Sequence, residues 1–476
     1  MTIRSSIAWT FSEQTLQFAL QFAVSVIIAR LLTPDEIGIF VLAMSAATVL
    51  TSLRTFGIGN YLIREPDLDS LKIRSAFGVM LLVSWSLGLA LYLSRHAVAG
   101  LYGRPEIAPV LTVLAASFAV FPFGAPAFSL LTREMRFRTL HNIGLAAAAG
   151  GSAASVALAL LGESAMALAW GLLVTTCLHS GLCLLALPGQ VRLRPSLVHW
   201  RQIVKFGGTL SLASLVATMN TEGIKVLLGI AMSPTGVAQF SRAAQIPNMV
   251  RQGIFAPVAR VLTPAWSEDV RNGRPLAEGA GKLVALNTIL VWPAFLALAL
   301  IAEPFITLVF GENWRPAGAI FPWVLLSGAM LTLLPQPEQL LIPHGRAGTI
   351  LKLRVLGTLF SLAIGAYAAT LGLEAFAVSR VAAAGFLMLL VFLAVRPLLA
   401  GCGRAFARAY LRAGAVALLA AIPPAAFRFS GRESLNVIEL LAMVAACAVL
   451  WFVGVVATRH LIWGEMRLIA RRAFGH

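Results

Sequence analysis

Apolar runs of about twenty residues recur along the whole chain, and they constrain its fold more than any other feature. An α-helix needs about twenty apolar residues to cross the roughly 30 Å hydrocarbon core of a bilayer. Hydrophobic residues make up 59% of the chain and charged residues only 12%, whereas about a quarter of a soluble protein is charged. The chain is therefore predicted to be an all-α integral membrane protein.

The runs between loop signals predict fourteen transmembrane helices. The expected spans are 8–32, 37–60, 76–98, 106–131, 139–161, 164–187, 203–231, 236–260, 282–302, 317–342, 350–371, 374–396, 408–427 and 437–459. Prolines at 121–126 and at 334–338 are expected to kink or break their helices.

Basic residues are distributed unequally between the two sides of this arrangement. The loops and tails on one side carry twenty-six Lys and Arg residues, and those on the other side carry six. Because Lys and Arg accumulate on the cytoplasmic side of membrane proteins, both termini are predicted to be cytoplasmic and the number of spans even. The same asymmetry explains the net charge of +17 without nucleic acid, which would need basic residues clustered on a soluble face.

The chain also contains an internal repeat with an offset of about 200 residues. Thr33–Phe40 and Ser233–Phe240 share the pattern Ser/Thr-Pro-x-x-Ile/Val-small-x-Phe, and residues 101–103 and 162–168 match 309–311 and 372–378 in the same order. The repeat predicts two parallel six-helix lobes, 1–190 and 191–400, related by an axis along the membrane normal. Residues 401–476 are expected to form two extra helices and a cytoplasmic tail.

Polar residues lie on one face of the helix that precedes each repeated turn, because they recur every three or four positions. They are Gln14, Gln17, Gln21 and Ser25 in the first helix and Ser211, Ser214, Thr218, Glu222 and Lys225 in the second. Two hydrophilic faces in an otherwise apolar sequence predict a shared polar cavity between the lobes. The candidates for hydrogen bonds to a hydrophilic substrate are Gln17, Gln21, Ser214 and Thr218.

Five basic residues lie within predicted spans rather than in loops. They are Arg54, Lys225, Arg242, Arg251 and Arg380. An ionised group at bilayer depth costs about 3 kcal/mol on insertion scales, so such groups normally face a cavity or a partner. We expect these five to give the cavity a positive field that binds an anionic substrate. The alternative for Arg54 and Arg251 is that they extend to the membrane interface.

Two acidic residues are candidates for coupling transport to H⁺ or Na⁺, namely Glu13 and Glu222. The alternative for Glu13 is an interfacial carboxylate, and the alternative for Glu222 is neutralisation by Lys225, three residues away. Asp35 and Glu36 are interpreted as a solvated helix start. No cofactor or metal site is expected, because the His and Cys residues lack metal-type spacing. No enzyme signature is recognisable either, so the chain is predicted not to be an enzyme.

Several segments resemble the polysaccharide transporters of the multidrug/oligosaccharidyl-lipid/polysaccharide exporter superfamily. They are Ile28–Phe40, Phe56–Arg64, Leu131–Phe137, Phe240–Ala243 and Phe310–Trp314. The resemblance implies the fold of the superfamily's MATE transporters. It also implies a flippase of the bacterial inner membrane that moves undecaprenyl-diphosphate-linked oligosaccharide units by alternating access, for O-antigen, capsule or exopolysaccharide assembly. The implied partners are the lipid-linked oligosaccharide, membrane lipids, and the polysaccharide polymerase and export machinery.

Other functions remain open at this point. A MATE-type drug/cation antiporter shares the fold, but cationic drugs favour acidic cavities, whereas the charge within these spans is mostly basic. A flippase for the peptidoglycan lipid precursor fits the charge pattern equally well. A membrane glycan polymerase or ligase generally needs a large periplasmic loop, and no loop on the outer side is long enough for one.

Overall fold

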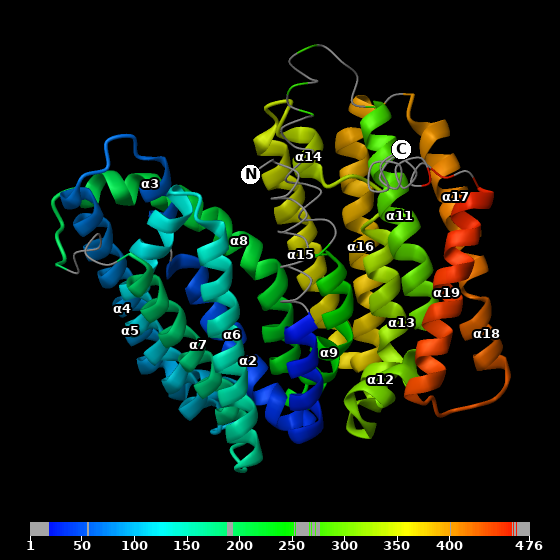
Figure 1. The fold of residues 1–476 in the computed structure, drawn as a ribbon, viewed down its shortest axis with the longest axis horizontal. Helices are drawn as coiled ribbons and strands as arrows, with labels where there is room; N and C mark the ends of the chain where they lie inside the picture. Colours follow the sequence, from blue (N-terminus) through cyan, green and yellow to red (C-terminus); the bar gives the residue numbers. More distant parts are fainter. Residues whose placement is uncertain are drawn as a thin grey trace, which may run out of the picture. The chain divides into compact units, whose positions relative to one another are not determined.

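Every regular element that the structure describes is a helix. The computed structural model describes residues 19–54, 57–187, 194–251, 277–399 and 401–458, with single residues at 253, 266, 268, 272, 460 and 463. This part of the chain forms two compact units, Met1–Ala238 (unit 1) and Gln239–His476 (unit 2), shown in Figure 1. The prediction of an all-α fold is confirmed.

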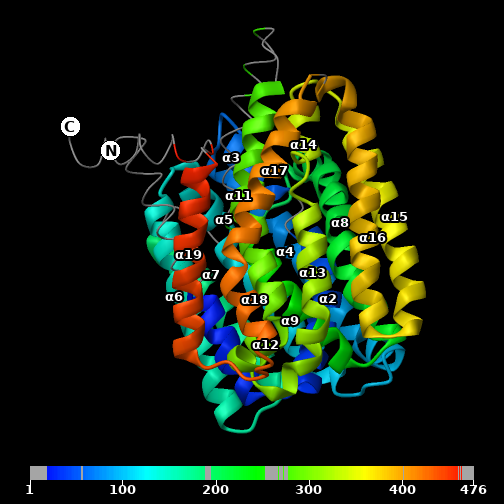
Figure 2. The same ribbon diagram turned by 90° about the vertical axis from the view of Figure 1, so that its right-hand side faces the viewer.

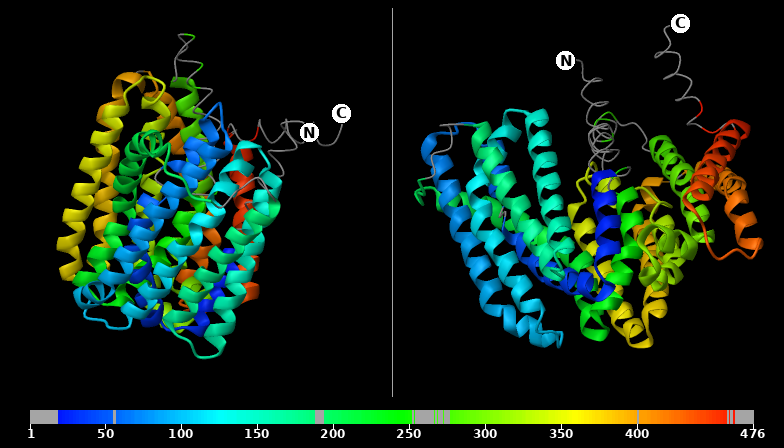
Figure 3. Two further views of the ribbon diagram at one scale, coloured as in Figure 1. Left: turned by 90° about the vertical axis from the view of Figure 1, so that its left-hand side faces the viewer. Right: turned by 60° about the horizontal axis from the view of Figure 1, so that its bottom comes forward.

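Unit 1 is a bundle of long helices (Figure 3). Its helices are Ala19–Leu31, α2 (Pro34–Arg54), α3 (Ile58–Arg64), α4 (Ser70–Leu101), α5 (Ile107–Arg133), α6 (Phe137–Leu160), α7 (Ala165–Ala186) and α8 (Trp200–Ala231), followed by the start of α9 (Pro234–Val250). Helix α5 packs against α4 and α7, and α6 packs against α7. Helix α2, which follows the first repeated turn, packs along α8, which precedes the second.

Unit 2 is a second helical bundle (Figure 2). After the rest of α9 it contains α11 (Ala277–Leu300), α12 (Ala302–Phe310), η2 (Glu312–Trp314), α13 (Arg315–Met330), α14 (Pro337–Leu341), α15 (Ala347–Leu371), α16 (Leu373–Val395), η3 (Arg396–Leu399), α17 (Gly403–Ala420), α18 (Ile422–Phe429) and α19 (Val437–Ala457). Helix α16 packs against α13 and α15, and α11 packs against α17 and α13.

Each of the fourteen predicted spans overlaps one of these helices. Nine helices of the described residues are long and apolar enough to cross a membrane, and the pair α17 and α18, bent by 46°, could form a tenth span. The chain is thus a multi-pass membrane protein. The number fourteen stays a prediction, because spans 8–32 and 236–260 extend beyond the described residues. The lobe boundaries at about 190 and 400 stay predictions as well.

Helix α5 continues through Pro122 instead of breaking there. Proline has no N–H, so the carbonyl four residues earlier loses its helical partner. That carbonyl belongs to Phe118, and the Ser84 hydroxyl of the neighbouring helix α4 donates to it at 2.6 Å. A donor from another helix therefore replaces the missing hydrogen bond. Without this donor the carbonyl would be unsatisfied inside the membrane, which is energetically costly.

Pro293 in α11 also leaves a carbonyl without its helical partner, and a side chain of another helix again donates to that carbonyl. The freed carbonyl is that of Ile289, and the indole Nε1 of Trp451 on α19 donates to it at 2.8 Å. The expected break at 334–338 does occur, because α13 ends at Met330 and α14 begins at Pro337.

Replacing Trp451 by Phe tests this account of the prolines. The substitution keeps an aromatic ring but leaves the Ile289 carbonyl without its donor, so we expect a loss of about 1–2 kcal/mol of stability. Thermal unfolding in detergent, followed by labelling of the buried thiols of Cys183 and Cys402, measures the change. The matched control is Trp323→Phe, since Trp323 makes no hydrogen bond to a described residue. Equal midpoints for the two variants would contradict the account.

Candidate functional site

The two repeated turns begin their helices in the same way. Thr33 and Ser233 are the N-cap residues, and a proline follows each of them at the first helical position. The Glu36 N–H donates to Thr33 Oγ1 at 3.4 Å, and the Gly236 N–H donates to Ser233 Oγ at 3.3 Å. Glu36 Oε2 accepts from the Thr33 N–H at 2.8 Å, which completes a capping box. The shared sequence pattern therefore encodes one local structure twice.

Asp35 connects the two turns. Its Oδ1 accepts hydrogen bonds from Arg104 Nη2 at 2.9 Å and from Thr235 Oγ1 at 3.1 Å. The interpretation of Asp35 as part of a solvated helix start was therefore incomplete. Asp35 and Thr235 occupy the same position of the repeat. The alignment itself was the signal that could have identified this contact.

The backbones also approach closely beside this hydrogen bond. A Cβ atom added to Gly38 of α2 would lie 2.0 Å from the Pro234 carbonyl oxygen, and one added to Gly229 of α8 would lie 2.2 Å from Leu42 Cδ2. The Pro234 carbonyl is backbone and leaves no room for a Cβ at Gly38, whereas a Cβ at Gly229 would require the Leu42 side chain to move. The Tyr102 ring lies beside Gly229, and burial raises the pKa of its phenol. Helix α2 thus contacts the α8–α9 turn closely at the predicted outer end.

We call the set Asp35, Gly38, Pro234 and Thr235 the outer turn contact. Arg54 lies at the opposite end of α2. Over 21 residues a helix rises about 31 Å, so Arg54 is about one membrane thickness from the outer turn contact. Lys and Arg counts place that end on the predicted cytoplasmic side.

The Arg54 guanidinium stacks on two aromatic rings of α5. Its Cζ lies 3.8 Å from the ring centroid of Phe121 and 4.9 Å from that of Phe118. Arg54 therefore turns inward onto α5 rather than outward to the interface. No ion pair to it occurs within the described part of the chain, and its Nε is buried without a hydrogen bond. Each cation–π contact contributes about 0.5–2 kcal/mol against a cost of about 3 kcal/mol for a charge at depth, and an anion would stabilise this side chain further.

Glu222 and Lys225 form an ion pair on α8. Lys225 Nζ lies 2.9 Å from Glu222 Oε2, and both side chains are partly buried. The alternative of mutual neutralisation is therefore realised in this structure. Thr218, one turn earlier, is also partly buried. Any ion that uses Glu222 must compete with Lys225, and no group of three potential metal ligands occurs among the residues that the structure describes.

Four hydroxyl groups on α2 were not among the sequence candidates. Ser45, Thr48, Thr51 and Ser52 each donate to a carbonyl of their own helix, at distances of 2.8, 2.7, 3.0 and 2.6 Å. These bonds satisfy the hydroxyl protons within the membrane and leave the oxygens as acceptors. Ser45, Thr48 and Thr51 recur every three residues toward Arg54, with Ser52 next to Thr51, and this recurrence is the signal that could have identified them.

Arg242 in unit 2 is buried among protein groups. Its Cζ lies 4.6 Å from the ring centroid of Trp314 and 4.8 Å from that of Phe310. Its Nη1 donates to Gln245 Oε1 at 2.9 Å, and only 8% of the residue is exposed. These contacts hold the start of α9 against the segment from α12 to α13.

Arg380 in unit 2 has a similar environment between α15 and α16. Its Nη1 and Nη2 donate to the hydroxyl and the carbonyl of Ser361, both at 2.9 Å. Nη2 also donates to Ser379 Oγ at 3.0 Å, and Cζ lies 4.6 Å from the Phe376 ring centroid. The guanidinium thus connects two helices of the same unit.

The remaining candidates are placed only in part. Arg251 follows α9 and is exposed, and Gln21 is exposed on the first described helix. Ser214 lies on α8. Glu13 and Gln17 lie outside the described residues.

Comparison with known proteins gives a consistent family. The sequence profile described as "Polysaccharide biosynthesis protein" matches residues 27–319. The chain is 25% identical over 338 residues to the succinoglycan biosynthesis transport protein ExoT of Rhizobium meliloti, which covers 70% of this chain and 67% of that protein. It is 22% identical over 358 residues to the lipopolysaccharide biosynthesis protein WzxC of Escherichia coli, with 74% and 72% covered. The teichuronic acid biosynthesis protein TuaB of Bacillus subtilis is 21% identical over 365 residues, covering 72% of each chain.

Solved structures share the fold. The lipid II flippase MurJ in an inward closed conformation superposes with a TM-score of 0.75 at 13% identity, covering 97% of this chain and 100% of that one. An inward-facing MATE-family multidrug transporter of the MOP superfamily superposes with a TM-score of 0.62 at 17% identity, covering 82% and 96%. The expected MATE-like fold is confirmed.

The outer turn contact yields a prediction about Gly38. Alanine at this position would collide with the Pro234 carbonyl, so we expect Gly38→Ala to separate the two turns. The reporter is a single cysteine introduced as Val237→Cys, at a fully buried position, after the four native cysteines are replaced by serine. Gly38→Ala should raise its rate of maleimide labelling several-fold. Gly144→Ala is the control, because a Cβ there meets no atom within 4 Å; identical rates for both variants would refute the steric argument.

The ion pair on α8 yields a second prediction. Glu222→Gln or Lys225→Gln alone leaves an uncompensated charge, so each should cost about 1–2 kcal/mol, whereas the double variant should cost less than the sum by about 1 kcal/mol. Thermal unfolding in detergent measures the coupling. The exposed pair Glu312 and Arg315 has the same spacing and should show less coupling. If the stability losses of the two single variants simply add in the double variant, the ion pair contributes nothing to stability.

Proposed function

The chain belongs to the polysaccharide biosynthesis protein family, and we propose that it flips undecaprenyl-diphosphate-linked oligosaccharide units across the bacterial inner membrane by alternating access. The observation that carries this proposal is the family match over residues 27–319, which includes both repeated turns. The relatives named as transport and polysaccharide biosynthesis proteins support it. Both termini are proposed to be cytoplasmic, and the products to enter O-antigen, capsule or exopolysaccharide assembly.

The outer turn contact gives the proposed cycle a physical basis. Its closed form brings α2 and the α8–α9 turn together at the predicted periplasmic end, which would expose a substrate path only toward the cytoplasm. Opening requires the Asp35–Thr235 hydrogen bond to break and Gly38 to move off the Pro234 carbonyl. Because Asp35 and Arg104 are each about one-third exposed, water can replace the lost bonds at a cost of about 1 kcal/mol. The closed form is therefore reversible.

The substrate in this proposal has an anionic diphosphate, a polar glycan and a long lipid tail. Arg54 is proposed to attract the diphosphate, since it is desolvated and has no carboxylate partner among the residues that the structure describes. Lys225 and Arg251 are proposed to add to the positive field. Gln17, Gln21, Ser214 and Thr218, together with the hydroxyl oxygens of α2, are proposed to bind the glycan's hydroxyl groups.

Arg242 and Arg380, which were expected to contribute to the positive field of the cavity, are assigned a structural role in this proposal. Their guanidinium groups already contact aromatic rings and polar groups of unit 2, so we propose that they position helices rather than contact the substrate. Glu222 and Glu13 are proposed to couple the cycle to H⁺ or Na⁺. In this proposal the ion pair between Lys225 and Glu222 must break before Glu222 can bind the ion.

The proposed partners are the lipid-linked oligosaccharide, membrane lipids, and the polymerase and export machinery. The family's transporters carry out no covalent chemistry, so the chain is proposed not to be an enzyme.

Substitution of Arg54 tests the proposal most sharply. A charge-assisted hydrogen bond is worth about 1.5–3 kcal/mol, so Arg54→Gln should reduce export of the surface polymer by at least about tenfold, and Arg54→Lys should retain part of it. Export is measured in cells whose own copy of the gene is deleted, with expression of each variant matched by immunoblot.

The control for this test is Arg95→Gln. Arg95 also stacks on an aromatic ring, with its Cζ 3.8 Å from the Tyr92 centroid, but it lies near the predicted outer end. It should support normal export. Normal export by Arg54→Gln would remove Arg54 from the substrate path, and accumulation of no lipid-linked sugar in the deletion strain would overturn the flippase proposal.

A further inference from the structure

The turn between α5 and α6 has an unusual residue at its tightest point. The Arg136 N–H donates to the Leu131 carbonyl at 3.0 Å, and the Met135 N–H donates to the Thr132 carbonyl at 3.1 Å. These two bonds define a Schellman motif, which ends a helix with one residue in the left-handed conformation. That residue is Met135, with a φ of 54°.

Other helices of this chain end with the same motif but use glycine. The left-handed residues are Gly103 after α4, Gly162 after α6 and Gly345 after α14. Met135 is the one residue other than glycine with a positive φ among the described residues. Because a Cβ makes this conformation unfavourable, a methionine here reduces stability where glycine would serve. An observed backbone outlier of this kind indicates a role for the side chain.

The methionine places an apolar side chain far outside the protein. Met135 is 75% exposed, and Phe137, two residues later, is 58% exposed. Arg136 and Arg138 alternate with them and are exposed as well. Helix α6 begins at Phe137 and has 24 residues, so it is about 36 Å long and exceeds the roughly 30 Å hydrocarbon core. A helix of this length has room to extend past the core at its ends, and we infer that Phe137, its first residue, lies at the level of the lipid headgroups.

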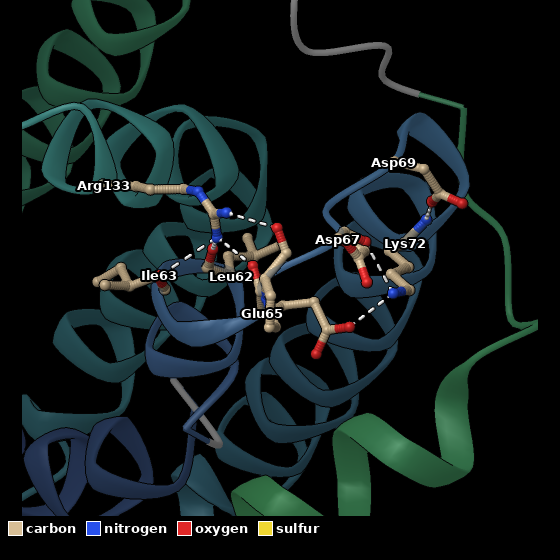
Figure 4. A network of polar contacts seen from close by, with 8 residues as sticks. Leu62, Ile63, Glu65, Asp67, Asp69, Lys72 and Arg133 are labelled. Carbon is tan, nitrogen blue, oxygen red and sulfur yellow. Dashed lines mark hydrogen bonds and ion pairs between the residues drawn. The ribbon is translucent and has the colours of Figure 1, made fainter.

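The base of the turn is fixed to α3 (Figure 4). Arg133 Nη1 donates to the carbonyls of Leu62 at 2.9 Å and Glu65 at 2.5 Å, and Nη2 donates to that of Pro66 at 3.2 Å. Arg133 thus caps the end of α3 and is not available to a ligand. A rigid base presents the following four residues in a fixed orientation.

Three acidic side chains near the turn, those of Glu65, Asp69 and Glu134, already have partners. The Glu65 carboxylate lies 2.5 Å from Lys72 Nζ, and the Asp69 carboxylate accepts from the Lys72 N–H at the start of α4, as Figure 4 shows. Glu134 lies 3.7 Å from Arg136 Nη1, and both groups are exposed. An exposed pair at this distance is weak, so a phosphate can replace Glu134 as the partner of Arg136.

We propose that Met135-Arg136-Phe137-Arg138, the headgroup turn, binds anionic phospholipid of the leaflet that it faces. Met135 and Phe137 insert between headgroups, and Arg136 and Arg138 contact the lipid phosphate. The alternation of apolar and basic side chains at headgroup depth matches a lipid that offers hydrocarbon and phosphate at the same level. This site is separate from the proposed substrate path, and its test does not depend on transport.

The experiment measures lipid binding to the purified full-length protein in detergent by native mass spectrometry. The probes are phosphatidylglycerol and, as the uncharged comparison, phosphatidylcholine. Arg136→Gln/Arg138→Gln should weaken the apparent affinity for phosphatidylglycerol at least threefold and leave that for phosphatidylcholine unchanged. Arg404→Gln/Arg408→Gln removes two exposed charges from the same predicted side and should have less than half of this effect.

Met135→Gly separates a binding role from a structural one. Glycine relieves the unfavourable φ, so the thermal midpoint in lipid-free detergent should stay equal or rise, while the affinity for phosphatidylglycerol falls at least twofold. Unchanged lipid affinity in both turn variants would overturn the proposal and leave a protein partner as the occupant to seek. Equal losses in the Arg404/Arg408 control would also overturn it, because binding would then depend on overall charge.

Discussion

Inside hydrocarbon, every polar group must find its partner within the protein, and this constraint determines most of what the structure contains. The carbonyls freed by Pro122 and Pro293 accept from Ser84 and Trp451. The Arg380 guanidinium is likewise surrounded by hydroxyls, a carbonyl and an aromatic ring of its own unit. Arg54 differs, because its charge meets only aromatic faces among the described residues. A site for an anionic substrate is therefore best sought where this constraint is left unsatisfied.

The two repeated turns satisfy the same constraint separately, and this independence would allow them to open and close. Each copy satisfies its helix start with its own N-cap, so neither needs the other for local stability. The link between them consists of the Asp35–Thr235 hydrogen bond and the contact of Gly38 with Pro234. These interactions are specific in geometry but modest in energy, since Asp35 is partly exposed and can be hydrated. A pair of autonomous turns joined in this way can separate and return within a transport cycle.

Sequence patterns predicted the helical membrane fold, because apolar length and turn residues act locally. They also predicted the similarity of Thr33–Phe40 and Ser233–Phe240. Partners distant in sequence were not predictable from local patterns: Arg242 stacks on Trp314, 72 positions later, and Asp35 bonds to Arg104. The five basic residues shared one property in the sequence, their depth. Only the packed neighbours distinguish Arg54, which meets aromatic rings alone among the described residues, from Arg242 and Arg380, which also donate hydrogen bonds to polar groups of unit 2.

The central claim is that the two repeated turns must separate for transport to occur. A reversible cross-link between them tests it directly: Asp35→Cys and Thr235→Cys are introduced together after the native cysteines are replaced by serine, and polymer export is followed before oxidation, after oxidation and after reduction. The account predicts export in the reduced protein, arrest when the disulfide forms, and recovery when it is reduced. Undiminished export by fully cross-linked protein would contradict it.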